Sequence, residues 1–145
     1  MHEGTVKIRR SKRTDFPMFM ALLTPLTLEE ETKAWARRWR RLAADPAHDC
    51  YVAEQDGMIQ GILLVSYLRR LRKYGWEAIL DMAVAPSAAY DIGQMLLNFA
   101  KERARKRGCQ RLLVCVTDTE GREWLASLAQ AGFGHAGEVL SCGGL

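Results

Sequence analysis

Short alternating or apolar runs, separated by turn residues, predict the strands of this chain. The expected strands cover residues 5–9, 50–54, 58–68, 76–84 and 111–117. The second and third flank Asp56-Gly57, and an Asp-Gly pair between two apolar runs is a strong β-hairpin signal. In the fourth, strict alternation places Glu77, Ile79 and Asp81 on one side of the strand.

Apolar residues three or four positions apart predict the helices. The expected helices cover residues 16–23, a segment opening at Thr27 and ending before Asp45, then 92–107 and 121–131. Asp15 is expected to cap the first helix, and Thr27 with Glu30 has the spacing of a capping box for the second.

The order of these elements predicts an α+β fold. Hairpins give antiparallel pairs, whereas the strand–helix–strand segment 76–117 should form a right-handed crossover between two parallel strands. We therefore expect a central mixed, mostly antiparallel sheet of about six to seven strands, flanked by about four helices. Residues 133–145 have room only for short strands.

Size and composition fit one globular domain over residues 1–145. Twenty-one Lys and Arg against 17 Asp and Glu give a net charge of +4, which permits a positive patch for anionic ligands. No apolar run approaches the roughly 18 residues that span a bilayer, and residues 1–13 lack the apolar stretch of a secretory signal. We expect a cytoplasmic protein that does not bind membranes.

The four cysteines do not suggest a metal site. Cys50, Cys109, Cys115 and Cys142 contain no C-x-x-C pair, and no histidine lies at ligand spacing from them. We expect no metal, and free thiols in a reducing compartment.

Residues 79–97 are the most informative segment for chemistry. A strand ends there, a short loop follows, and a helix begins near Ile92-Gly93. The first turn of a helix has backbone N–H groups without partners inside the helix, and these suit a phosphate. Gly93 would allow close approach of a ligand or of another part of the chain.

Four short motifs, in this order and spacing, make the sequence similar to a known family. They are Ile8-Arg9 followed by Asp15, the segment 81–86 (DMAVAP), Ile92-Gly93 before an apolar run, and Gly132-Phe133. The chain resembles the GNAT superfamily of acyl-CoA-dependent N-acyltransferases. The resemblance implies that acetyl-CoA donates an acetyl group directly, in a ternary complex, to a primary amine of a small molecule or a peptide.

The resemblance also implies the cofactor site. The pantetheine arm would pair with the backbone of Met82, Ala83 and Val84, where two parallel strands separate. The pyrophosphate would lie on the backbone of the following loop and helix start, which are Ala88, Ala89, Tyr90, Asp91, Ile92 and Gly93.

The chain departs from the family pattern in this loop. Ala88 stands where the family has Arg or Gln, and Asp91 stands where it has Gly. A carboxylate near a phosphate is unfavourable unless Asp91 turns away and caps the helix. The family's usual acid, a tyrosine before the closing Gly-Phe, is also missing, and Tyr90 and Cys115 are possible substitutes.

Proton transfer needs a base, because acyl transfer requires a neutral amine. Glu77 and Asp81 are the candidates, since both lie on one side of the strand that leads to the loop. The alternative for each is a solvated or arginine-paired strand residue.

Three functions compete at this point. The first is an N-acetyltransferase. The second is a catalytically weak or inactive GNAT-like domain that binds acyl-CoA or a protein, which the altered loop and missing tyrosine favour. The third, a nucleic-acid-binding domain, has the arginine clusters in its favour but no recognised motif. Because few residues remain for the last strands, a second subunit could complete the sheet edge, and a homodimer is possible.

Overall fold

The computed structural model describes residues 4–23, 32–72, 74–85, 90–116, 125–137 and 139–144. Within these ranges the chain forms one five-stranded sheet in the order β1-β2-β3-β4-β5. The strands are β1 (Lys7–Arg10), β2 (His48–Gln55), β3 (Met58–Arg69), β4 (Trp76–Val84) and β5 (Cys109–Val114). The first three pairs are antiparallel, and β4 pairs with β5 in parallel.

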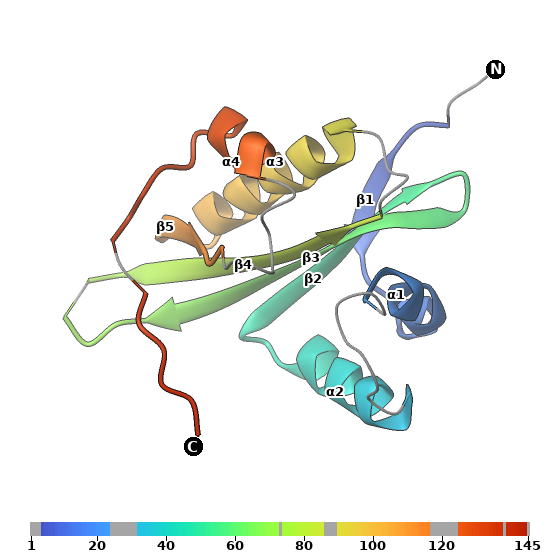
Figure 1. Cartoon of the computed structure of the whole chain (residues 1–145), viewed down its shortest axis with the longest axis horizontal. Coiled ribbons are helices and arrows are strands. Elements are labelled where there is room, and N and C mark those ends of the chain that lie inside the picture. The colour runs from blue at the N-terminus through green and yellow to red at the C-terminus, as the bar shows by residue number, and fades with distance from the viewer. Residues whose placement is uncertain are drawn as a thin grey trace.

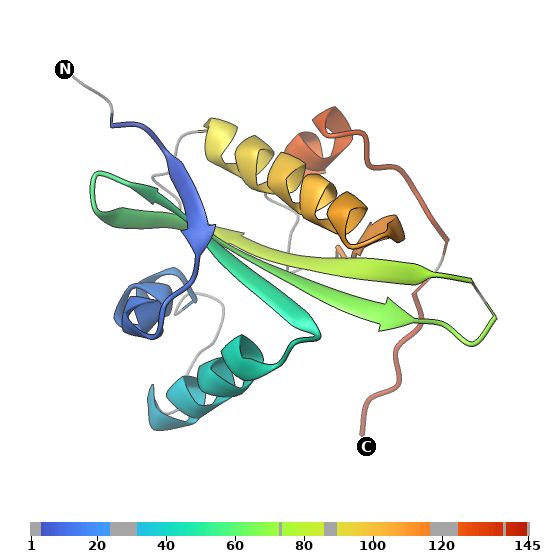
Figure 2. The same ribbon diagram turned by 180° about the vertical axis from the view of Figure 1, so that it is seen from behind.

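Helices cover both faces of the sheet. They are α1 (Phe16–Leu23), α2 (Thr32–Ala44), α3 (Tyr90–Lys106) and α4 (Leu125–Gln130), with a single 3₁₀ turn at Arg13–Asp15. Figure 1 shows α3 and α4 on one face and α1 and α2 on the other, and Figure 2 shows the same layers from behind. The predicted mixed α+β fold with one parallel crossover is confirmed.

The number of strands differs from the prediction of about six to seven. The described residues contain five, because residues 133–137 and 139–144 form no regular strand. The predicted opening of the second helix, with the Thr27 and Glu30 capping box, lies outside the described residues. The third helix begins at Tyr90, two residues before its predicted start, and β5 begins at Cys109 and ends at Val114.

The hairpin predicted from Asp56-Gly57 is confirmed. Gln55 pairs with Met58, which leaves a two-residue turn. Both turn residues have a positive φ, 52° at Asp56 and 76° at Gly57, as the turn that matches the twist of a hairpin requires. This turn sets the register of the two pairs next to it, and a bulge between Ala53 and Glu54 shifts the rest of the hairpin by one residue.

Asp15, which we expected to cap the first helix, directly precedes α1, but the described hydrogen bonds of its carboxylate go to the chain before the helix. The carboxylate accepts two hydrogen bonds from the Arg9 guanidinium, at 2.8 and 2.9 Å, and one from the backbone N–H of Lys12, at 2.6 Å. The six-residue spacing of Arg9 and Asp15 is therefore an ion pair that joins β1 to the start of α1. The bond to Arg9 lowers the pKa of Asp15 despite its burial.

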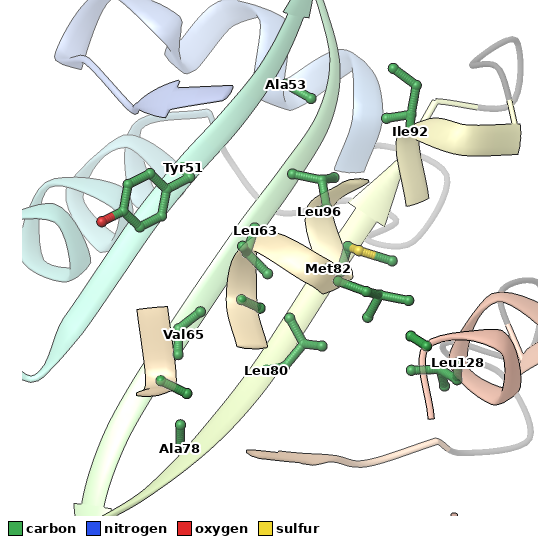
Figure 3. Close-up of a cluster of buried hydrophobic side chains, with 14 of the residues drawn as sticks. Tyr51, Ala53, Leu63, Val65, Ala78, Leu80, Met82, Ile92, Leu96 and Leu128 are labelled. Atoms are coloured by element: carbon green, nitrogen blue, oxygen red, sulfur yellow. The ribbon is translucent and has the colours of Figure 1, made fainter. Parts of the chain in front are cut away.

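The main core lies between α3 and the sheet (Figure 3). Leu63 from β3, and Ile92, Leu96 and Leu97 from α3, are completely buried. Each such side chain contributes about 1.5–3 kcal/mol of hydrophobic stabilisation. This packing fixes α3, and with it the first turn of α3, against the strands.

Gly61 lets α3 approach the sheet closely. A Cβ atom at this position would lie 2.7 Å from Cδ1 of Leu96 and 3.4 Å from the carbonyl oxygen of Ala83. Gly61 pairs with Val84, the last residue of β4. The missing side chain thus allows close contact at the end of β4 that faces the predicted cofactor loop.

Candidate active site

The two parallel strands, β4 and β5, stop pairing halfway along β4. Their pairing ends at Leu80 and Val114, whereas β4 remains paired with β3 as far as Val84. On the side that faces β5, the segment from Asp81 to Val84 therefore has no strand partner among the described residues. Within the part of the chain that the structure describes, the backbone of Met82, Ala83 and Val84 pairs with no strand on this side, so an extended ligand can add to it in the manner of a further strand.

The predicted pantetheine-binding residues occupy this edge. The side chain of Met82 is buried in the main core, near Leu96 and Leu128 in Figure 3, and Ala83 and Val84 are half-buried. A ligand along the edge would meet the backbone of these residues, while the Met82 side chain packs below it.

The start of α3 lies close to the C-terminal end of β4, as the surroundings of Gly61 in the neighbouring strand β3 show. A Cβ atom on Gly61 would lie 3.4 Å from the carbonyl oxygen of Ala83 and 3.5 Å from Cγ2 of Ile92, so both atoms are near the same point. The first backbone N–H groups of a helix lack partners inside the helix and carry its positive dipole end. The first turn of α3 therefore offers an anion-binding group near the end of β4.

The loop residues can be placed only in part. Ala88 and Ala89 lie outside the described residues, and Tyr90 is described only as the first residue of α3. Asp91 is the second helical residue and is exposed, so it stands inside the first turn and not at the capping position that we expected. The Ile92 side chain is completely buried, which leaves only its backbone for a ligand.

Gly93 is a packing position between two helices. It is buried, and a Cβ atom there would lie 3.7 Å from Oγ of Ser127 in α4. The adjacent Gln94 donates a hydrogen bond from Nε2 to the backbone carbonyl of Ser127. A Cβ atom at this distance would be in ordinary van der Waals contact, so α4 packs on the first turns of α3 without requiring a glycine, and close approach of a ligand at Gly93 stays a prediction.

The structure separates the two candidate bases. Glu77 is buried, with Oε2 2.7 Å from Nε of Arg70 and Oε1 3.7 Å from Nε of Arg111. Glu77 is thus paired with two arginines, and its role as a base stays a prediction. It lies five positions before Met82, roughly 17 Å along an extended strand.

Asp81, in contrast, is exposed and is the first β4 residue beyond the β5 pairing. Cys115, one of the proposed substitutes for the missing acid, is exposed directly after Val114, the last paired residue of β5. The two residues thus follow the last paired positions of neighbouring strands, where the strands begin to separate.

The described cysteines are all free thiols, as expected. Among the described residues, no cluster of three or more His, Cys, Asp or Glu side chains could hold a metal ion. Within the same ranges, none of the helices has the length and apolar character needed to cross a membrane.

Sequence reasoning missed a feature at the other end of the sheet. A cavity of about 390 Å³ is lined by Pro46, Ala47, Tyr67, Trp76 and Arg107. Its residues come from four separate segments, and no local pattern in the sequence brings them together.

Comparison with known protein families decides the classification. The profile described as "Acetyltransferase (GNAT) family" matches residues 16–133. The chain belongs to this family. The match confirms the predicted superfamily and the prediction that the chain is an acetyltransferase.

Solved structures of the same fold cover nearly the whole chain. A transcriptional regulator from Bacillus halodurans C-125 has 23% identity and a TM-score of 0.83, over 96% of this chain and 99% of that one. Glucosamine-6-phosphate N-acetyltransferase from Arabidopsis thaliana has 19% identity and a TM-score of 0.79, over 97% and 99%. The aminoglycoside N-acetyltransferase AAC(6')-Iy, in complex with CoA, has 15% identity and a TM-score of 0.80, over 97% and 95%. No curated protein sequence gives a significant match.

Proposed function

We propose that this GNAT protein is an N-acetyltransferase that moves an acetyl group from acetyl-CoA to the primary amine of a small molecule or peptide, directly in a ternary complex. The observation that carries the proposal is the open edge of β4 from Asp81 to Val84 beside the start of α3. Family membership and the CoA-bound neighbour support acetyl-CoA as the donor. The neighbours that act on amino sugars and aminoglycosides support an amine acceptor.

In this proposal the chain holds the donor by its backbone. The edge of Met82, Ala83 and Val84 pairs with the extended pantetheine arm, and the loop with the first turn of α3 receives the pyrophosphate. Because Asp91 is exposed in that turn, its carboxylate opposes the dipole's attraction for phosphate. We therefore expect weaker donor binding than a neutral residue would allow.

We assign the role of general base to Asp81. The Asp81 carboxylate takes a proton from the ammonium group, directly or through water, and the neutral amine then attacks the thioester carbonyl. The carbon–sulfur bond breaks, and the second proton of the nitrogen passes to the leaving thiolate or to solvent, which gives an amide and a free thiol. Asp81 suits this role because it is exposed beside the open edge, whereas Glu77 is engaged by two arginines far from it. The thiolate, with a reference pKa of about 8.5, leaves readily even without a dedicated acid.

The direct test is release of free thiol from acetyl-CoA with a panel of amino sugars, aminoglycosides, polyamines and peptides. We expect saturable turnover with at least one amine. Measurable acetyl-CoA binding without any turnover would support the weak or inactive domain in place of the enzyme. Absence of acetyl-CoA binding would contradict both.

Substitution separates the two carboxylates. Asp81→Asn should lower kcat by about 10²–10⁴-fold with little change in KM for acetyl-CoA. Activity should recover as the pH rises, because the amine then loses its proton to solvent. Glu102→Gln removes a carboxylate from the exposed C-terminal half of α3 and serves as the control. A pH profile of Asp81→Asn parallel to that of the wild type would contradict the assignment.

Two further predictions accompany this function. Light scattering of the purified protein tests the homodimer, and cell fractionation tests the cytoplasmic location.

A further inference from the structure

A compact group of charges lies at the C-terminal end of α3, opposite the cofactor site. Asp49, in β2, is only 2% exposed. Its carboxylate accepts a hydrogen bond from the Tyr67 hydroxyl at 2.7 Å, and it lies 3.2 Å from Arg10 Nη1, 3.5 Å from Arg103 Nη2 and 3.2 Å from Arg107 Nη2. One buried carboxylate thus faces three guanidinium groups, which leaves two positive charges in excess.

Arg107 links this group to the cavity of about 390 Å³ described above. Its guanidinium carbon lies 4.6 Å from the centre of the Tyr67 ring, and 41% of its side chain is exposed. Within this cluster, Arg107 bonds to Asp49 through its Nη2 atom alone. A guanidinium has five N–H donors, so most of its donor capacity remains for a ligand.

Two aromatic side chains also line the cavity. Tyr67 comes from β3, and Trp76 from the start of β4 is 39% exposed although it is a large apolar residue. Arg69 stacks on the Trp76 ring at 4.4 Å from its centre and adds another positive charge to this region. Two carboxylates outside the cluster are neighbours of lining residues in the sequence, and both have partners. Asp45 accepts a hydrogen bond from Ala47 N–H and lies 3.5 Å from His48, and Glu77 is paired with arginines.

From this combination we propose that the cavity is a second ligand site, which takes a small organic anion with a planar apolar group. The planar group lies against the exposed part of Trp76, and the carboxylate or phosphate meets Arg107, which covers the Tyr67 ring. The volume is at the lower end of ordinary small-molecule pockets. The excess positive charge favours an anion, and the exposed part of Trp76 favours a flat apolar body over an inorganic ion.

The cluster beneath the cavity keeps Arg107 in place. Burial raises the pKa of Tyr67, so its hydroxyl remains a donor to Asp49. Burial also acts to raise the pKa of Asp49, but the hydrogen bond from Tyr67 and the nearby arginines outweigh it, and the net shift is downward. Asp49 therefore stays ionised and anchors one edge of the guanidinium.

The site is separate from that of acetyl-CoA. Trp76 and Val84 are the two ends of β4, roughly 26 Å apart along an extended strand. Arg107 follows the last residue of α3, whereas the proposed pyrophosphate site is at its first turn. A ligand in the cavity can therefore be bound while the donor site is filled.

The test is an amide and indole NMR titration of the full chain with phenyl phosphate, phenylacetate, inorganic phosphate and benzyl alcohol. We expect saturable shifts of Trp76, Ala47 and their neighbours with the two aromatic anions, at a roughly millimolar dissociation constant or tighter. Phenyl phosphate and phenylacetate distinguish the two anionic groups. Benzyl alcohol and inorganic phosphate, which each lack one of the two features, should bind at least tenfold more weakly. Equal binding of benzyl alcohol would overturn the role of the anion.

Variants identify the contacts. Arg107→Gln and Trp76→Leu should each weaken phenyl phosphate binding by roughly tenfold or more. Arg105→Gln is the matched control, because Arg105 lies two residues before Arg107, is exposed and pairs with Glu102. If Arg107→Gln disturbs the fold, the affinity of Trp76→Leu for phenyl phosphate tests the proposal instead. Unchanged affinity in Trp76→Leu, or displacement of the probe by saturating acetyl-CoA, would overturn the proposal without bearing on the acetyltransferase activity.

Discussion

Replacing Gly61 by alanine tests the close packing of α3 on the sheet. The new Cβ would lie 2.7 Å from Leu96 Cδ1, whereas carbon atoms in good contact are about 3.5–4.0 Å apart. The completely buried Leu96 side chain, or α3 itself, must then move by about 1 Å. Overpacking of this kind costs about 1–3 kcal/mol.

Part of that cost is offset, because alanine restricts the unfolded chain more than glycine by about 0.4–1 kcal/mol. We expect a net loss of about 1–2 kcal/mol in the free energy of unfolding. For a chain of this length, that corresponds to a Tm lower by roughly 2–8 °C. Urea and thermal unfolding followed by circular dichroism measure both quantities.

Two further variants make the test specific. Gly134→Ala is the control, since a Cβ there meets nothing within 4 Å, and it should change stability by less than about 0.5 kcal/mol. Leu96→Ala removes the clashing atom, so adding Gly61→Ala to that background should cost at least about 1 kcal/mol less than in the wild type. A Gly61→Ala protein as stable as the wild type, or an unchanged penalty beside Leu96→Ala, would refute the reasoning.

Three other predictions follow from the same structure. The lowered pKa of Asp15 means that its stabilising effect is present above its unfolded pKa of about 3.9 and disappears as the pH falls through the lower folded value, so Asp15→Asn should flatten the dependence of Tm on pH below about 4. Exposed Cys115 and Cys142 should react quickly with a thiol reagent at pH 8. Cys50, whose pKa is raised by burial to about 12, should react only when the protein unfolds. Fast labelling of Cys50 in the native protein would contradict its buried position. Glu77→Gln should lower the free energy of unfolding by about 1–2 kcal/mol in urea titrations, because two half-exposed arginines lose their partner. Its kcat should fall far less than that of the Asp81 variant. A larger fall in kcat for Glu77→Gln than for Asp81→Asn would return the role of base to Glu77.

Local signals in the sequence were enough for much of the fold. The bounds of β4 and α1 agree with the prediction, and the Asp56-Gly57 turn was recognisable because two positive φ angles require such residues. Interactions between distant segments were not recognisable. Asp49 is 54 and 58 residues from Arg103 and Arg107, and no periodicity reveals that β2 brings them together.

In the candidate site, too, local features could be predicted from the sequence and contacts between distant segments could not. Alternation placed Glu77 and Asp81 on one side of β4, but it could not say where β5 stops pairing with that strand. The β4–β5 register shifts between Trp76 and Glu77 and ends at Leu80, and this tertiary feature is what separates the two carboxylates. The sequence predicts a close approach at Gly93, but it does not predict that Ser127 of α4 is the residue next to it.

An amide NMR titration with acetyl-CoA tests the central claim most directly. The account predicts saturable shifts concentrated at Ala83, Val84 and the first turn of α3, with residues at the start of β4 unaffected. Absence of saturation, or shifts gathered around Trp76 and Arg107 instead, would contradict a donor site at the open edge of β4.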